Sequence, residues 1–163
     1  MPWASRKRGA CRWFACGLDT FANLAGMGAI TFTVPGKPVP QPRPQISTIG
    51  GRGRAYVKAS HPIHAYRQAV ALNAKAAGAT PTDEAPLTLV IDLVFKRPQS
   101  HFKANGELNP RTALKVPPGD CSNYQKGIED CLNGVAWVDD VQVGKTVVEK
   151  TYGTEDRTTV RII

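Results

Sequence analysis

The chain has 163 residues, the length of one domain, and 42% of them are hydrophobic, as in an ordinary globular protein. No apolar run reaches the roughly 18 residues that a membrane-spanning helix needs, so we expect no membrane role. Lys and Arg number 21 against 13 Asp and Glu, and this net charge of +8 favours a polyanionic partner such as nucleic acid.

The two signs of charge are segregated along the chain. No acidic residue lies between Asp19 and Asp83, whereas the acids collect in the C-terminal half. A basic surface beside a confined acidic cluster suits phosphodiester chemistry, because bases hold the strand and carboxylates hold a metal ion. A solvated basic face remains the alternative. The bases in the acid-free stretch are Lys37, Arg43, Arg52, Arg54, Lys58, Arg67 and Lys75.

Residues 1–26 differ from the rest of the chain, since they combine a basic cluster with a weakly apolar stretch that lacks a clean signal-peptide core. We expect a poorly ordered basic extension there, and translation that begins at Met27 would explain it. The remaining residues, 27–163, are predicted to form a single α+β domain. Its mixed sheet of about four to five strands should be packed by two main helices.

Residues 29–34 alternate apolar residues with threonine, which predicts a strand with one buried face. The proline-rich segment 35–44 must leave the sheet as an extended arm, because proline cannot donate to a ladder. The glycine-rich stretch after it reads as a flexible basic loop. A linker or a PxxP ligand is the alternative for this arm. We predict DNA contacts from Lys37, Arg43, Arg52, Arg54 and Lys58.

A helix is predicted to start near Pro62, capped by Ser60, and to run to about Gly78. A nearly continuous apolar run at 87–95 predicts a buried central strand. Residues 97–118, rich in proline, asparagine and bases, read as a long mobile loop that leads to the acidic cluster.

The cysteines match neither a zinc knuckle nor a redox CxxC, and a chain that is not disulfide-dense fits a reducing, cytoplasmic compartment. His61 and His64 could share a helical face. They could therefore bind a metal ion, or they could be surface or helix-capping residues. The four cysteines are Cys11, Cys16, Cys121 and Cys131.

The acidic cluster lies on and after a second predicted helix, which starts at Asp120 and stops at Asn133-Gly134. Its apolar side chains gather on one side and its polar ones on the other. The chain then returns to the pair Asp139 and Asp140. Capping and surface aspartates are common, so periodicity alone leaves both a metal site and a structural role open.

The order of residues in this cluster resembles that of RusA-type Holliday junction resolvases. In that family an Asp-x-Asp-Asn opens a helix, and a lysine and an aspartate follow at fixed spacing. An Asp-Asp pair with a glutamine two residues later closes the site. The corresponding residues here are Asp120, Asn123, Lys126, Asp130, Asp139, Asp140 and Gln142, and the proline-rich segment and Lys150 with Tyr152-Gly153 also resemble family features.

The resemblance implies a metal-dependent endonuclease acting on branched DNA in recombination and repair. Asp120 and Asp140 would hold Mg²⁺, or Mn²⁺ in its place, with Asp139 or Asp130 as a further ligand. Lys126 would stabilise charge on the scissile phosphate, and Asn123 would contact DNA. Ser122 stands where known members place a second aspartate, so its hydroxyl would contribute directly or through water.

Two symmetric cuts in a four-way junction imply a C2 homodimer. The carboxylates from the helix start and from the downstream turn are expected to converge on one ion. The competing interpretations are a junction-binding protein with weakened catalysis and a protein-interaction domain that uses the proline arm.

Overall fold

A computed structural model describes residues 29–49 and 52–163, so the expected extension, 1–26, and Met27 lie outside the described part. The main sheet has four strands in the order β1–β6–β4–β5. Neighbouring strands of this sheet are antiparallel, except that β4 and β5 are parallel. The strands are β1 (Ile30–Pro35), β4 (Leu87–Lys96), β5 (Val143–Gly153) and β6 (Arg157–Ile162).

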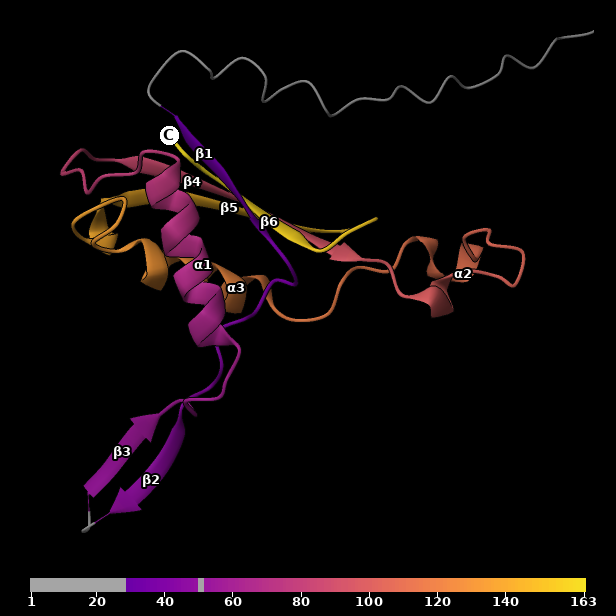
Figure 1. Ribbon diagram of the computed structural model, residues 1–163, viewed down its shortest axis with the longest axis horizontal. Helices are drawn as coiled ribbons and strands as arrows, with labels where there is room; N and C mark the ends of the chain where they lie inside the picture. The colour runs from indigo at the N-terminus through magenta and orange to yellow at the C-terminus, as the bar shows by residue number, and fades with distance from the viewer. Residues whose placement is uncertain (1–28, 50–51) are drawn as a thin grey trace, which may run out of the picture.

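Two helices, α1 (Ile63–Ala76) and α3 (Cys121–Leu132), pack on one face of this sheet. The arrangement is the mixed α+β fold that the sequence predicts (Figure 1). Alternate residues of β1 divide between the two faces, with Phe32 and Val34 buried and the threonines between them exposed. β4 is mostly buried because β6 and β5 flank it and the helices cover it.

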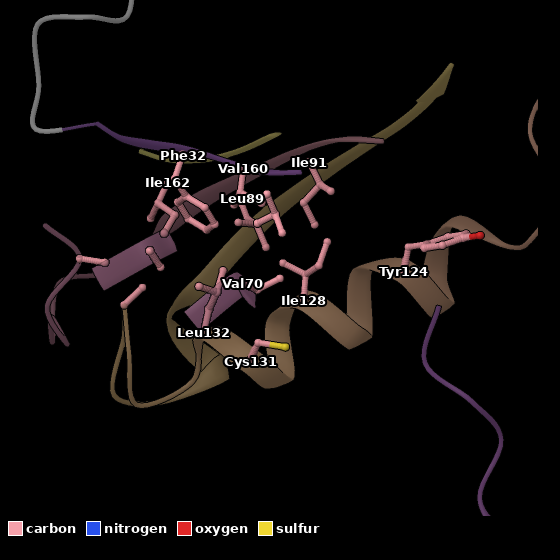
Figure 2. Close-up of a cluster of buried hydrophobic side chains, with 14 of the residues drawn as sticks. Phe32, Val70, Leu89, Ile91, Tyr124, Ile128, Cys131, Leu132, Val160 and Ile162 are labelled. Carbon is pink, nitrogen blue, oxygen red and sulfur yellow. The ribbon is translucent and has the colours of Figure 1, made fainter. Parts of the chain in front are cut away.

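The core lies between the sheet and the two helices. Figure 2 shows strand residues such as Leu89 and Ile91 facing Ile128 and Leu132 of α3. Each of these four side chains is fully buried, which contributes about 1.5–3 kcal/mol per side chain. The core therefore fixes the position and direction of α3 on the sheet.

The start of α1 differs from the prediction. Its N-cap is Pro62, and the ring Nδ1 of His61, not Ser60, accepts the backbone N–H of Ile63 at 3.1 Å. Proline cannot cap through its side chain, so the preceding histidine satisfies one free donor of the first turn.

The segment 97–118 is not the structureless loop that we expected. It contains a 3₁₀ turn, η1 (Gln99–His101), and a short helix, α2 (Pro110–Ala113). The hydroxyl of Thr112 donates to the carbonyl of His101 at 2.9 Å, and the side chain of Asn109 accepts the N–H of Arg111. These local hydrogen bonds order a segment whose composition suggested none.

Two parts of the chain project from the core. One is the hairpin of β2 (Gln45–Ile49) and β3 (Arg52–Tyr56), and the other contains α2 (Figure 1). Within the described ranges, no helix has the length and apolar character required to cross a membrane.

Candidate active site

Asp120 is the N-cap of α3 and is exposed. Its carboxylate makes no hydrogen bond or ion pair with any described residue, so it does not cap the helix as the sequence allowed. The preceding Gly119 has φ +88°, and a Cβ there would come within 2.9 Å of the Tyr124 ring. Only glycine fits this turn, which leads the chain into α3 and leaves the Asp120 carboxylate in solvent.

Lys150 of β5 holds the segment before Asp120 in place. Its ammonium donates to the carbonyl of Pro117 at 3.1 Å and also to the carbonyl of Gly119. The start of α3 is therefore tied to the later half of β5, and a positive charge lies beside Asp120.

The polar residues of the first turns of α3 are exposed, as expected of residues that contact a ligand. Ser122 and Lys126 are four residues apart and so share one helical face. Asn123 uses its backbone carbonyl to accept the N–H of Gln41 at 2.9 Å. The start of α3 therefore presents a carboxylate, a hydroxyl, an amide and an ammonium to solvent.

Asp139 is the N-cap and Asp140 the first residue of a 3₁₀ turn, η2 (Asp140–Gln142), which lies directly before β5. The Asp139 side chain accepts the N–H of Val141, which makes it the cap of this turn. The fully buried Trp137 donates its indole N–H to Asp140 Oδ1 at 3.0 Å. This bond fixes the direction of the exposed Asp140 carboxylate.

Gln142 is a structural residue of the same turn. Its Oε1 accepts the backbone N–H groups of Val138 and Asp139, at 2.9 and 2.8 Å. Its Nε2 donates to the carbonyls of Thr82 and Glu84. Because all of these bonds converge on one amide, the Asp139–Asp140 turn is fastened to the loop before β4.

Asp130 is engaged elsewhere. Its carboxylate forms an ion pair with Arg67 of α1 at 3.0 Å, and the same Arg67 nitrogen donates to Gln41 Oε1 at 2.7 Å. Asp130 thus links α3 to α1 and to the proline-rich segment, and it lies near the opposite end of α3 from Asp120.

The expected convergence of Asp120 and Asp140 within one chain is wrong. The 12 residues of α3 separate them, which corresponds to about 18 Å of helix. β5 gives the same result, because Lys150, beside Asp120, and Val143, just after Asp140, lie near opposite ends of this 11-residue strand. Ligand oxygens of one Mg²⁺ lie within about 4 Å of each other.

The acidic groups also form no larger cluster. In the part of the chain that the structure describes, no group of three or more His, Cys, Asp or Glu side chains is arranged to hold a metal ion. The ligand set predicted from Asp120, Asp130, Asp139 and Asp140 is therefore not assembled by one chain.

The proline-rich segment is packed, not free. Pro38 is fully buried, and Gln41 lies against α3 at Gly127, where its backbone N–H donates to the carbonyl of Asn123. To serve as a PxxP ligand, the proline-rich segment would have to detach from α3 before an SH3-type domain could bind it. Lys37 and Arg43 are exposed on either side of it.

The remaining predicted DNA contacts lie in the hairpin and just after it. Lys58 is exposed just after it, and Arg52 and Arg54 belong to β3, although their side chains lie outside the described part. His64 bonds the carbonyl of Lys58 at 3.1 Å through a ring nitrogen. Together with the cap made by His61, this gives both histidines structural partners.

The described cysteines, Cys121 and Cys131, are free thiols. Cys131 donates to the carbonyl of Gly127 at 2.8 Å, and burial raises its pKa to about 12. Cys11 and Cys16 lie outside the described residues.

Sequence reasoning did not predict the contacts by which two residues position the candidate site, although it had named Lys150 as a family feature. Trp137 orients Asp140, and Lys150 anchors the turn before Asp120. A lone tryptophan and a strand lysine carry no spacing signal for such roles, although both lie inside or near the segments that resemble the resolvases.

The chain is similar in sequence to a known protein family and to one known protein. Residues 35–163 match the family described as "Endodeoxyribonuclease RusA". The "Uncharacterized protein YqaN" of Bacillus subtilis (strain 168) is 31% identical over 141 residues, which cover 83% of this chain and 96% of that protein. The family match spans β4, β5, β6, the two helices and both Asp120 and Asp140. The chain belongs to the RusA endodeoxyribonuclease family.

Proposed function

We propose that this protein is a metal-dependent endonuclease that hydrolyses phosphodiester bonds at Holliday junctions or related branched DNA, in recombination and repair. The observation that carries the proposal is the family match, which covers the whole described domain except its first residues. The exposed carboxylate of Asp120, which has no partner among the described residues, supports it, because a structural aspartate at a helix start would normally cap the helix. We expect its action in the cytoplasm of a bacterial or phage-infected cell, where its substrate lies.

We further propose that the protein acts as a homodimer whose active sites are shared between subunits. Asp120 and Asp140 are oxygen donors of the kind that Mg²⁺ or Mn²⁺ prefers, and both are exposed. They lie too far apart in one chain to share an ion, so they fit it only if one of them comes from a second copy. A C2 dimer would then carry two such sites, matching the two symmetric cuts that a four-way junction needs.

The ion, when bound, would neutralise charge on the scissile phosphate and activate a water molecule. The chain's own residues would position the substrate. Lys126 would place a positive charge against the phosphate, and Ser122 on the same face would donate a hydrogen bond from its hydroxyl. Trp137 would keep the Asp140 carboxylate in one orientation.

Further contacts would come from the basic residues around the proline-rich segment and hairpin. Lys37, Arg43 and Lys58 are exposed there, with Arg52 and Arg54 in β3. We propose that they bind the DNA backbone, together with Asn123 at the start of α3. This binding should weaken as salt rises.

The test is cleavage of a synthetic four-way junction and of a duplex of the same sequence, each with and without Mg²⁺. The wild type should cut the junction only when Mg²⁺ is present. Asp140→Asn keeps an oxygen for the Trp137 hydrogen bond, so it should fold and bind the junction but cut at least about a hundredfold more slowly. Glu155→Gln, an exposed substitution in the turn before β6, is the matched control and should cut normally.

Cleavage by Asp140→Asn at the wild-type rate would remove the metal role of this carboxylate. Wild-type protein that binds the junction but never cuts it, with either Mg²⁺ or Mn²⁺, would instead support the alternative, a junction-binding protein weakened by Ser122.

A further inference from the structure

The proline-rich segment and the hairpin of β2 and β3 together form the basic arm, residues 36–56, whose hairpin projects from the core (Figure 1). Between Gln41 and Val57, no hydrogen bond or ion pair joins the part of the arm that the structure describes to the rest of the domain. Beyond the hairpin, Val57 packs against the core, and the carbonyl of Lys58 accepts the N–H of His61 at 2.9 Å. The direction of the hairpin therefore depends on Gln41 at one stem and on Val57 and Lys58 at the other.

Gln41 is fastened to the helices in two ways. Its backbone N–H donates to the carbonyl of Asn123, and its side-chain Oε1 accepts a hydrogen bond from Nη2 of Arg67 at 2.7 Å. The same Nη2 donates to the carboxylate of Asp130 at 3.0 Å. Arg67 makes no other hydrogen bond with the described residues, and its Nε is buried without a partner among them. Asp130 therefore helps to set where Arg67 holds the arm.

This contact lies along the face of α3 that carries Lys126. Lys126 and Asp130 are four residues apart and so share one helical face. Gln41 lies against Gly127, the residue after Lys126. Arg43 follows two residues later in the arm, so its backbone lies at most about 7 Å from that of Gln41. The basic part of the arm thus begins beside the lysine that would bind the scissile phosphate.

We propose that Asp130 is a positioning residue of the DNA-binding surface: through Arg67 it fixes Gln41, and with it the hairpin, in line with Lys126. The basic residues of the arm would then meet the backbone of the DNA that Lys126 contacts. The proposal deepens the endonuclease function proposed above and rests on it. It gives Asp130 a role at the DNA, in place of the metal-ligand role that the family resemblance implied.

The first test is binding of a synthetic four-way junction by Asp130→Asn without divalent ions. Electrostatics alone predicts tighter binding, because the substitution removes a negative charge that repels phosphates. The proposal predicts the opposite. The Kd should rise about tenfold, because a neutral amide holds Arg67 less firmly and releases the arm. Glu155→Gln, which removes an exposed acid elsewhere, is the control and should leave the Kd unchanged or lower it. A Kd for Asp130→Asn that is unchanged or lower would contradict the proposal.

The second test removes the other end of the same link. Gln41→Ala leaves the ion pair between Arg67 and Asp130 in place, but it deletes the side chain that this pair holds. It should raise the Kd to a similar extent. The double variant Q41A/D130N should bind within about twofold of the weaker single variant, because both changes release one contact. Losses that add in the double variant would show that Asp130 acts on DNA binding by another route.

Cleavage separates positioning from metal binding. Replacing a metal ligand by an amide should raise the Mg²⁺ concentration for half-maximal cutting at least about tenfold. A positioning residue changes only the DNA concentration for half-maximal cutting. With saturating junction, Asp130→Asn should therefore keep the wild-type Mg²⁺ midpoint and cut within about twofold of the wild-type rate. A shifted midpoint would return Asp130 to the metal site.

The position of the arm can be measured without DNA or metal. Spin labels on cysteines introduced at Ile46 of β2 and Leu72 of α1, both exposed, report the distance between the hairpin and the core. An excess of unlabelled protein keeps labels on different chains apart. Cys131 can stay, because it is buried and its pKa of about 12 keeps the thiol protonated. The cysteines to be replaced by serine are Cys11, Cys16 and Cys121.

In this labelled protein, the wild-type arm should give one narrow distance distribution. Asp130→Asn and Gln41→Ala should each widen it at least about twofold, and Glu155→Gln should not. A protein whose arm loosens in this way but that never cuts junctions would refute the endonuclease function and leave the positioning role intact. A protein that cuts junctions with Mg²⁺ but keeps a narrow distribution in both variants would refute the positioning role and leave the function intact.

Discussion

Mixed dimers that carry two different inactive subunits should regain cleavage. Asp120→Asn and Asp140→Asn each disable both sites of their own homodimer. If every site combines Asp120 from one subunit with Asp140 from the other, a mixed dimer holds one site with both substitutions and one with neither. The proposed metal site predicts such sharing, because about 18 Å of helix separates the two residues in one chain.

The expected magnitude follows from counting sites. Two tagged variants, co-expressed and purified through both tags, give mixed dimers with one intact site of two. They should nick one junction strand at about half the wild-type rate per dimer, while paired resolution stays lost. Strand-specific end labels on the junction separate single nicks from paired cuts.

The matched control is a mixed dimer of a wild-type subunit and a subunit with both substitutions. Shared sites would leave it inactive, because each site then contains one asparagine. Sites contained within one chain would reverse both results, so an active control and an inactive complementing pair would refute the shared site.

Three further predictions address the site and the fold. Ser122→Asp, which supplies a second carboxylate on the first turn of α3, should keep or raise Mg²⁺-dependent cleavage, and complete inactivation would show that this position has another role. Leu132→Ala, at a fully buried position, should lower the free energy of unfolding by about 2–5 kcal/mol in urea titrations, whereas Leu72→Ala, at an exposed position, should change it little. Burial, with Lys115 nearby, lowers the pKa of His101, so the unfolded chain takes up this proton at a higher pH than the folded one. Stability should therefore be full above about pH 6.5 and fall below it, and His101→Gln should reduce the difference between urea midpoints measured at about pH 7.5 and pH 5.5.

Local patterns in the sequence determined two of the strands and both main helices, whereas the glycine-rich stretch that was read as a flexible loop belongs to the hairpin of β2 and β3. The alternation in β1, the apolar run of β4 and the boundaries of α3 at Asp120 and Asn133 were all predicted and are confirmed. These features depend on residues close together in the chain, so their spacing carries the information. The segment 97–118 was misjudged because its order comes from specific hydrogen bonds, such as that from Thr112 to His101, which composition does not reveal.

The sequence could name the acidic residues but not decide which of them meet. An extended connection of residues 133–139 could have carried Asp140 back toward Asp120. Instead, the N–H of Gly134 bonds the carbonyl of Trp137 and folds this connection into a turn at the far end of α3. The parallel pairing of β5 with β4 then directs the chain away from that turn. Contacts between residues far apart in the chain set these directions, so only the tertiary structure reveals that Asp120 and Asp140 of one chain lie apart.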